Sequence, residues 1–151
     1  MEKLAKKGNT KTKYNIIMAT EEYLPELAQM YRDMYLELMP EQCKKDIQSY
    51  IDRMKYFIKN YDVWVDTQLR GFFAIKEITD PITPNKILYD GMSVYIKPEY
   101  RKTKLLYYFY NCMFDNYKGD IIGFVAPNSE HLKVLKKRHK LLGFNYILER
   151  I

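Results

Sequence analysis

Residues able to perform acid–base or anion-binding chemistry are few in this sequence and lie in its second half. Asp90 follows an apolar stretch, and its carboxylate could act as a general base, directly or through a water. His131 and His139 could titrate near neutral pH, although the basic residues at 136–140 would lower the pKa of His139. Residues 101–104, R-K-T-K, precede an apolar helical pattern, and a helix N-terminus attracts anions. The structural alternatives are a strand bulge at Asp90, a solvated helix end around His139 and a solvated basic turn at 101–104.

These residues must be positioned by elements whose order follows from hydrophobic periodicity. The apolar patterns predict strands at 14–19, 63–65, 70–78, 87–96, 120–126 and 144–151, and helices at 20–39, 46–58, 102–117 and 129–142. The order β-α-α-β-β-β-α-β-α-β predicts an α/β fold with a mixed central sheet and helices on both faces.

Local signals refine this order. Residues 66–68, D-T-Q, predict an antiparallel hairpin between the second and third strands. The strand–helix–strand stretch from 87 to 126 predicts a parallel crossover. Thr20 before two glutamates is expected to cap the first helix, and Gly119 is expected at the C′ position of the third.

Length and charge restrict the function classes. The chain has 151 residues and a net charge of +6, which suits one domain at 14–151 behind a flexible basic tail at 1–13. The tail could touch nucleic acid or simply be solvated; we expect the latter, because no aromatic residue in its basic run offers base stacking.

The two cysteines lie far apart, so neither a disulfide framework nor a zinc site is expected. Without an apolar run of ~20 residues or a secretory pattern, we expect a cytoplasmic protein that does not enter membranes.

Three patterns together resemble the Gcn5-related N-acetyltransferase family. Residues 69–72, L-R-G-F, resemble the family's entry into its third strand, and residues 96–101, I-K-P-E-Y-R, match its V-x-P-x-x-R signature. Asn128 follows the fifth predicted strand, and the next helix ends in Gly143-Phe144, as in the family. The resemblance covers roughly residues 14–151. It implies an enzyme that transfers an acyl group from acetyl-CoA, or another acyl-CoA, to an amine that the sequence does not identify.

The resemblance also implies a cofactor site. In the family the strand ending in V-x-P separates from its neighbour, and its backbone pairs with the pantetheine amides like an added strand. The following helix N-terminus binds the pyrophosphate. The residues implied are Val94, Tyr95, Ile96, Arg101, Lys102, Thr103, Lys104, Leu105, Leu106 and Asn128. Lys104 and Leu106 replace two family glycines, so either lysine charge binds the phosphates instead or cofactor binding has been lost.

The resemblance also implies catalytic residues, although this sequence departs from the family pattern at these positions. The family base is often a glutamate on the strand that holds Ile96, and Asp90 is the carboxylate late in that strand. His139 occupies the position of a family tyrosine that protonates the leaving thiolate, and His131 lies three residues after Asn128.

A second interpretation remains open. An Asn-x-x-His pattern before a closing glycine–aromatic pair also resembles phage proteins with this fold, some carried in virions. A non-catalytic protein of that kind would bind a protein partner instead of a cofactor, in the host cytoplasm or the virion. An exposed final strand could also pair with a second copy of the chain.

Overall fold

The computed structural model describes residues 14–43, 46–79 and 87–122, and for residues 87–92 and 120–122 the backbone alone. These residues form a five-stranded sheet in the order β1-β2-β3-β4-β5. The strands are β1 (Ile16–Met18), β2 (Asp62–Asp66), β3 (Gly71–Thr79), β4 (Ile87–Ile96) and β5 (Asp120–Ile122). Neighbours pair antiparallel as far as β4, and β4 pairs with β5 in parallel.

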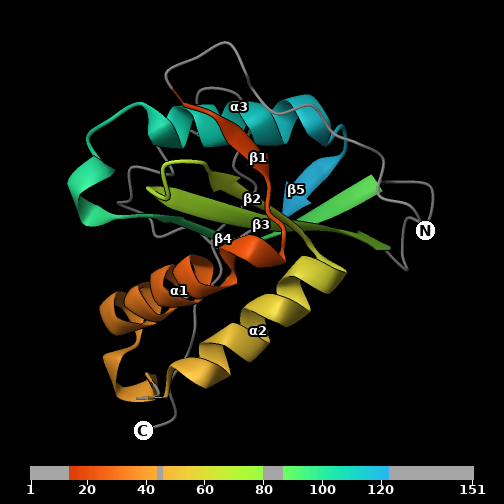
Figure 1. Ribbon diagram of the computed structural model, residues 1–151. Helices are drawn as coiled ribbons and strands as arrows, with labels where there is room; N and C mark the ends of the chain where they lie inside the picture. The colour runs from red at the N-terminus through yellow and green to blue at the C-terminus, as the bar shows by residue number, and fades with distance from the viewer. Residues whose placement is uncertain (1–13, 44–45, 80–86, 123–151) are drawn as a thin grey trace, which may run out of the picture.

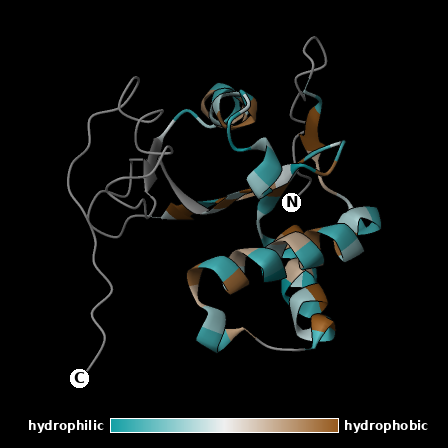
Figure 2. Ribbon diagram, turned by 90° about the vertical axis from the view of Figure 1, so that its left-hand side faces the viewer, coloured by the Kyte–Doolittle hydropathy of each residue, from teal (hydrophilic) through white to brown (hydrophobic). Residues whose placement is uncertain are grey.

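Helices cover both faces of the sheet (Figure 1). α1 (Leu24–Leu38) and α2 (Ile47–Asn60) lie side by side on one face, and α3 (Leu105–Asn116) lies on the other. Short 3-10 turns precede α1, follow it and precede α3, at η1 (Glu21–Tyr23), η2 (Pro40–Gln42) and η3 (Pro98–Tyr100). Figure 2 shows hydrophilic and hydrophobic residues interspersed along α1 and α2, as helices with one buried side require. None of the helices in the described ranges is long and apolar enough to cross a lipid bilayer.

Alternating side chains of β2 and β3 pack on opposite faces, which explains why both strands contain unbroken apolar runs, at 63–65 and 72–75. Val63, Val65 and Phe72 belong to the core beneath α1 and α2. Trp64 and Phe73 belong to the core beneath α3. The sheet is therefore the middle layer of three.

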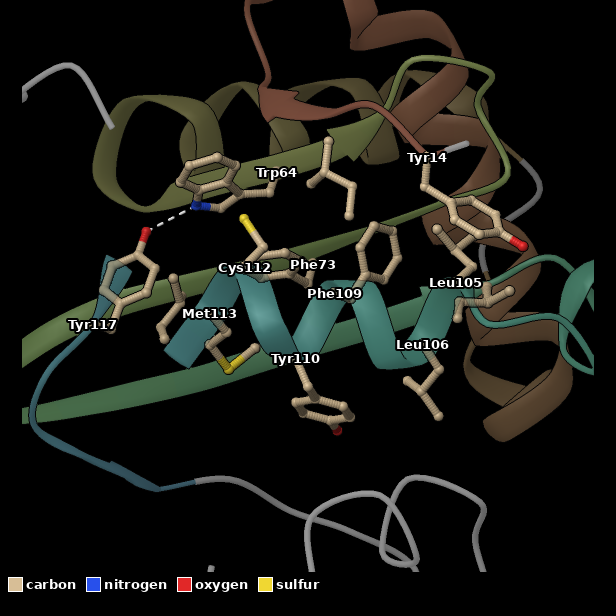
Figure 3. Packing of buried hydrophobic residues seen from close by; sticks show 13 residues of the cluster. Tyr14, Trp64, Phe73, Leu105, Leu106, Phe109, Tyr110, Cys112, Met113 and Tyr117 are labelled. Carbon is tan, nitrogen blue, oxygen red and sulfur yellow. Dashed lines mark hydrogen bonds between the residues drawn. The ribbon is translucent and has the colours of Figure 1, made fainter. Parts of the chain in front are cut away.

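The core beneath α3 holds a polar pair (Figure 3). The indole Nε1–H of Trp64 donates to the Tyr117 hydroxyl at 2.8 Å, and that hydroxyl donates to Asp62 at 2.7 Å. Trp64 is fully buried, so without this acceptor its N–H would remain unsatisfied in the core.

A buried ion pair fixes the turn between β2 and β3. Arg70 binds Asp66 through two guanidinium nitrogens, one of them at 2.9 Å from Oδ1, and its guanidinium lies 4.6 Å from the centre of the Tyr14 ring. Leu69 adopts a left-handed backbone, with φ of 57°, to close the turn. The Lys97 amide then donates to the Arg70 carbonyl, so the turn is tied to the end of β4.

A glycine is required at position 71 because atoms of β4 and α3 lie too close to it for a side chain to fit. A Cβ on Gly71 would lie 2.5 Å from the Tyr95 carbonyl oxygen and 3.0 Å from Cε2 of Phe109. The glycine in the L-R-G-F pattern therefore lets β3, β4 and α3 meet at one point.

The fold class predicted from the sequence is confirmed, as are the antiparallel hairpin and the parallel crossover. Two local predictions were wrong. Thr20 starts the turn η1 instead of α1, and its side chain makes no capping hydrogen bond. α3 ends at Asn116 with an extended Tyr117, and Gly119 is not left-handed. The helix and strand expected after residue 126, and the tail at 1–13, lie outside the described residues.

Candidate functional site

The end of β4 carries the candidate site. On one side β4 pairs with β3 as far as Ile96, opposite Gly71. On the other side the described pairing with β5 ends at Asp90, opposite Ile122. Beyond Ile122 the chain lies outside the described residues, so the neighbour of β4 on this side is described only as far as Asp90.

A register shift interrupts β4 beside this point. Asp90 pairs with Lys76, whereas Ser93 pairs with Ala74, so β4 has one residue more than β3 between these pairs. The strand irregularity considered for Asp90 and the following glycine is therefore present. The backbone of Asp90 lies between β3 and β5, and nothing described locates its carboxylate.

One hydrogen bond shows which way the backbone N–H and C=O groups point along the end of β4. The Lys97 amide donates to the Arg70 carbonyl, and in an antiparallel ladder the bonded pairs alternate. The N–H and C=O of Tyr95 therefore point toward β3, and those of Val94 and Ile96 point away from it. Of the backbone groups implied for pantetheine binding, those of Val94 and the Ile96 N–H face away from β3, and the Ile96 carbonyl accepts from Arg101.

α3 begins close behind the end of β4. The chain leaves β4 through η3 and reaches an N-cap at Lys104, whose side chain is exposed together with those of Lys102 and Thr103. The Thr103 hydroxyl accepts from the Leu105 amide at 3.3 Å, and the described residues offer no acceptor for the Leu106 amide. This turn thus presents a helix N-terminus beside two lysines.

The side chains of Leu105 and Leu106 do not lie in front of this N-terminus. Both are buried in the core beneath α3, with 0% and 7% of their surface exposed. In Figure 3, Leu106 lies along the same flank of α3 as Tyr110. Leucine at a family glycine position therefore adds core packing, and Lys104 is the substitution that changes the surface.

Arg101 joins this turn to α1. Its guanidinium binds both carboxylate oxygens of Glu37 at 2.7 Å, and its Nε donates to the Ile96 carbonyl at 2.9 Å. The Tyr95 hydroxyl lies 3.4 Å from Glu37, and burial and the nearby charge of Glu37 raise the pKa of Tyr95 to about 12. Arg101 therefore holds the end of β4 against α1 through charge and hydrogen bonds.

Sequence reasoning missed Glu37. A signal was present, because Glu37 lies in the last turn of α1, where the helix dipole disfavours negative charge. A carboxylate in that position is expected to have a cationic partner, and Arg101 supplies it.

The remaining candidates fall elsewhere. His131, His139 and Asn128 lie outside the described residues. In the described part of the chain, no three His, Cys, Asp or Glu side chains are grouped so that they could hold a metal ion.

The fold matches solved acetyltransferase structures. A predicted acetyltransferase with acetyl-CoA from Clostridium acetobutylicum superposes with a TM-score of 0.71 at 12% identity, over 91% of this chain and 96% of that one. A possible acetyltransferase from Clostridium difficile 630 gives 0.68 at 15% identity, over 91% and 97% of the two chains. A ribosomal-protein-alanine N-acetyltransferase from Brucella melitensis biovar Abortus 2308 gives 0.67 at 11% identity, over 91% and 99%.

Sequence comparison adds no closer relative, since no protein-family model and no curated protein matches the chain. The similarity therefore resides in the path of the backbone. It spans nearly the whole of the solved structures as well as most of this chain. The chain has the fold of the Gcn5-related N-acetyltransferases.

Proposed function

We propose that this protein is an acyl-CoA-dependent N-acyltransferase that transfers an acetyl group, or another acyl group, to an amine. The observation that carries the proposal is the end of β4, whose backbone groups at Val94 point away from β3, beside the N-terminus of α3 in a fold shared with acetyltransferases. One of these neighbours is described as solved with acetyl-CoA.

The residues at this place fit the cofactor. The N–H and C=O of Val94 and the N–H of Ile96 point away from β3, which suits pairing with the amides of pantetheine, while the Ile96 carbonyl is bound by Arg101. Lys102 and Lys104 supply positive charge beside the first turn of α3, which suits a pyrophosphate. Arg101 is engaged with Glu37, so its role in this site is to position the end of β4.

The chemistry requires few protein groups. The bound cofactor would supply an activated acyl thioester, and the protein must hold an amine against it in its neutral form. Orientation alone provides a large part of the acceleration in such transfers. We propose Asp90 as the group that accepts the amine proton, directly or through a water, because its backbone lies in β4, the strand whose end carries the candidate site. His131 and His139 remain candidates for donating a proton to the leaving thiolate.

A thermal-shift titration with acetyl-CoA, CoA and ATP tests the proposal. A ligand that binds only the native state adds ~2.7 kcal/mol to stability at a hundredfold excess over its dissociation constant. We expect a dose-dependent rise with acetyl-CoA and CoA that greatly exceeds the rise with ATP.

Two lysines at opposite ends of α3 provide matched variants. Lys104→Glu reverses charge at the N-cap, and Lys118→Glu makes the same change just beyond the C-terminal end. We expect Lys104→Glu to abolish most of the acetyl-CoA shift and Lys118→Glu to leave it nearly unchanged. An equal loss in both variants would show that net charge, and not this turn, drives binding.

A non-catalytic protein with the same fold is the second candidate. Lysine in place of the family glycine at position 104 favours it, because glycine allows the backbone to approach phosphate closely. The same titration separates the two functions. No shift at millimolar acetyl-CoA would overturn the enzyme proposal and favour a role in binding a protein partner.

A further inference from the structure

A pocket lies between α1 and α2, and none of its lining residues belongs to β4 or to the N-terminus of α3. Its volume is about 240 Å³, and it is open to solvent. Six residues from α1, η2 and α2 line it: Tyr31, Tyr35, Gln42, Ser49, Tyr50 and Arg53. Cavities of ~150 Å³ accept a benzene ring, so this pocket has room for a single ring with a small substituent.

Three tyrosine rings form its apolar wall. Tyr31 meets Tyr35 and Tyr50 edge to face, with ring centres 5.1 and 6.1 Å apart, and Tyr35 lies 6.0 Å from Tyr50. Tyr31 and Tyr50 are buried, so the wall is held in place by the core beneath α1 and α2. A wall of this kind suits a flat apolar group.

The polar groups of the pocket determine the sign of charge it accepts. Arg53 is the one lining residue with a formal charge, and it forms no ion pair with any carboxylate in the described ranges. Its guanidinium lies 5.3 Å from the centre of the Phe57 ring, which orients it without neutralising it. A tyrosine-lined pocket can bind cations, but the guanidinium disfavours a cation here and favours an anion.

Other polar side chains line the same pocket. Gln42 contributes an amide, Ser49 a hydroxyl and Tyr35 a phenol to the lining. The Tyr31 hydroxyl donates to the Tyr35 hydroxyl at 3.4 Å, and burial raises the pKa of Tyr31 above its ordinary value, so this phenol is uncharged at neutral pH. A carboxylate accepts hydrogen bonds from such groups and binds an arginine side chain with two parallel bonds.

We propose that this pocket binds a small aromatic carboxylate, with its ring against Tyr31, Tyr35 and Tyr50 and its carboxylate on Arg53. The proposal does not depend on acyl transfer, because none of the lining residues belongs to the edge of β4 or to the N-terminus of α3. Either proposal can fail while the other stands.

NMR titration of the full-length protein with benzoate tests the pocket, with benzamide and benzylamine as ligands of the same shape. We expect saturable chemical-shift changes at Gln42, Ser49 and Arg53 with benzoate, and weaker binding of both analogues. Equal affinity for benzoate and benzamide would overturn the proposal, because the carboxylate would then contribute nothing. Absence of saturable changes at these residues would overturn it as well.

Two variants distinguish a direct contact between benzoate and Arg53 from an effect of the overall charge of the protein on binding. Arg53→Gln should weaken benzoate binding by about tenfold or more, since a hydrogen bond to a charged group is lost. Lys59→Gln removes the same charge from the exposed end of α2 outside the pocket and should leave the affinity within about twofold. Arg53 is exposed, so its variant is expected to fold, and the thermal unfolding curve checks this. An unchanged benzoate affinity in Arg53→Gln would refute the assignment.

Discussion

Replacement of Gly71 by alanine tests the close contact between β3, β4 and α3. The added methyl group would lie 2.5 Å from the Tyr95 carbonyl oxygen, 3.0 Å from Phe109 Cε2 and 3.2 Å from the Ile96 Cα. Two of these atoms belong to the backbone of β4, which is paired with β3 and cannot rotate away as a side chain could. β3 and β4 must therefore separate, or α3 must move outward.

Two opposing contributions set the magnitude. Overpacking a rigid core costs ~1–3 kcal/mol. Alanine also restricts the unfolded chain more than glycine does, which stabilises the native state by ~0.4–1 kcal/mol. Gly71 has no positive φ, so no backbone strain is added. We expect a net loss of ~1–2 kcal/mol in the free energy of unfolding, or ~2–8 °C in Tm for a chain of this size.

Urea denaturation followed by far-ultraviolet circular dichroism measures this loss. Thr79→Ala, at the exposed end of β3, is the matched control, and a surface change of this kind stays within ~0.5 kcal/mol. A Gly71→Ala protein as stable as the wild type would refute the reasoning. It would show that β4 and α3 adjust at no cost and that the glycine is not required by packing.

Other predictions follow from the buried polar groups. Asp66→Ala leaves Arg70 charged and unpaired at 7% exposure, so we expect a loss of ~3–5 kcal/mol in urea denaturation; a loss below ~1 kcal/mol would mean that water reaches the guanidinium. Tyr117→Phe removes the acceptor of the Trp64 N–H and should cost ~1–3 kcal/mol, with a change in the fluorescence of this single tryptophan; unchanged stability and fluorescence would contradict the hydrogen bond. The pKa of Tyr95 is raised to about 12 from an ordinary ~10, so its contribution to stability is complete below pH ~10 and is lost as the pH rises toward 12. A Tyr95→Phe protein should therefore lose less stability than the wild type between neutral pH and pH ~11, and equal losses would contradict this assignment.

The end of β4 shows which structural features could be predicted from local sequence patterns. The V-x-P-x-x-R pattern and the apolar run before it predicted a strand, a break at Pro98 and a helix behind them, and each is present. These features depend on residues near one another in the chain, and proline and hydrophobic periodicity act at short range. The start of α3 was less well predicted, since η3 and three turn residues precede Lys104.

Contacts between distant residues could not be predicted in the same way. Glu37 and Arg101 are separated by 64 residues and meet because α1 and the start of α3 both reach the end of β4. The role of Leu106 also depended on the fold, because a leucine in a predicted phosphate-binding turn could have pointed outward. The packing of α3 on the sheet turns it into the core.

The sequence by itself determined the order of the elements as far as residue 122, the hairpin, the parallel crossover and the acetyltransferase-type fold. Periodicity and turn residues specify these features locally, and the three patterns supplied the resemblance. The tertiary structure decided which backbone groups of β4 point away from β3, that Arg53 has no carboxylate partner among the described residues, and where the tyrosine pocket lies. These depend on strand register and helix packing, which bring together residues such as Tyr35 and Arg53 that no local pattern relates.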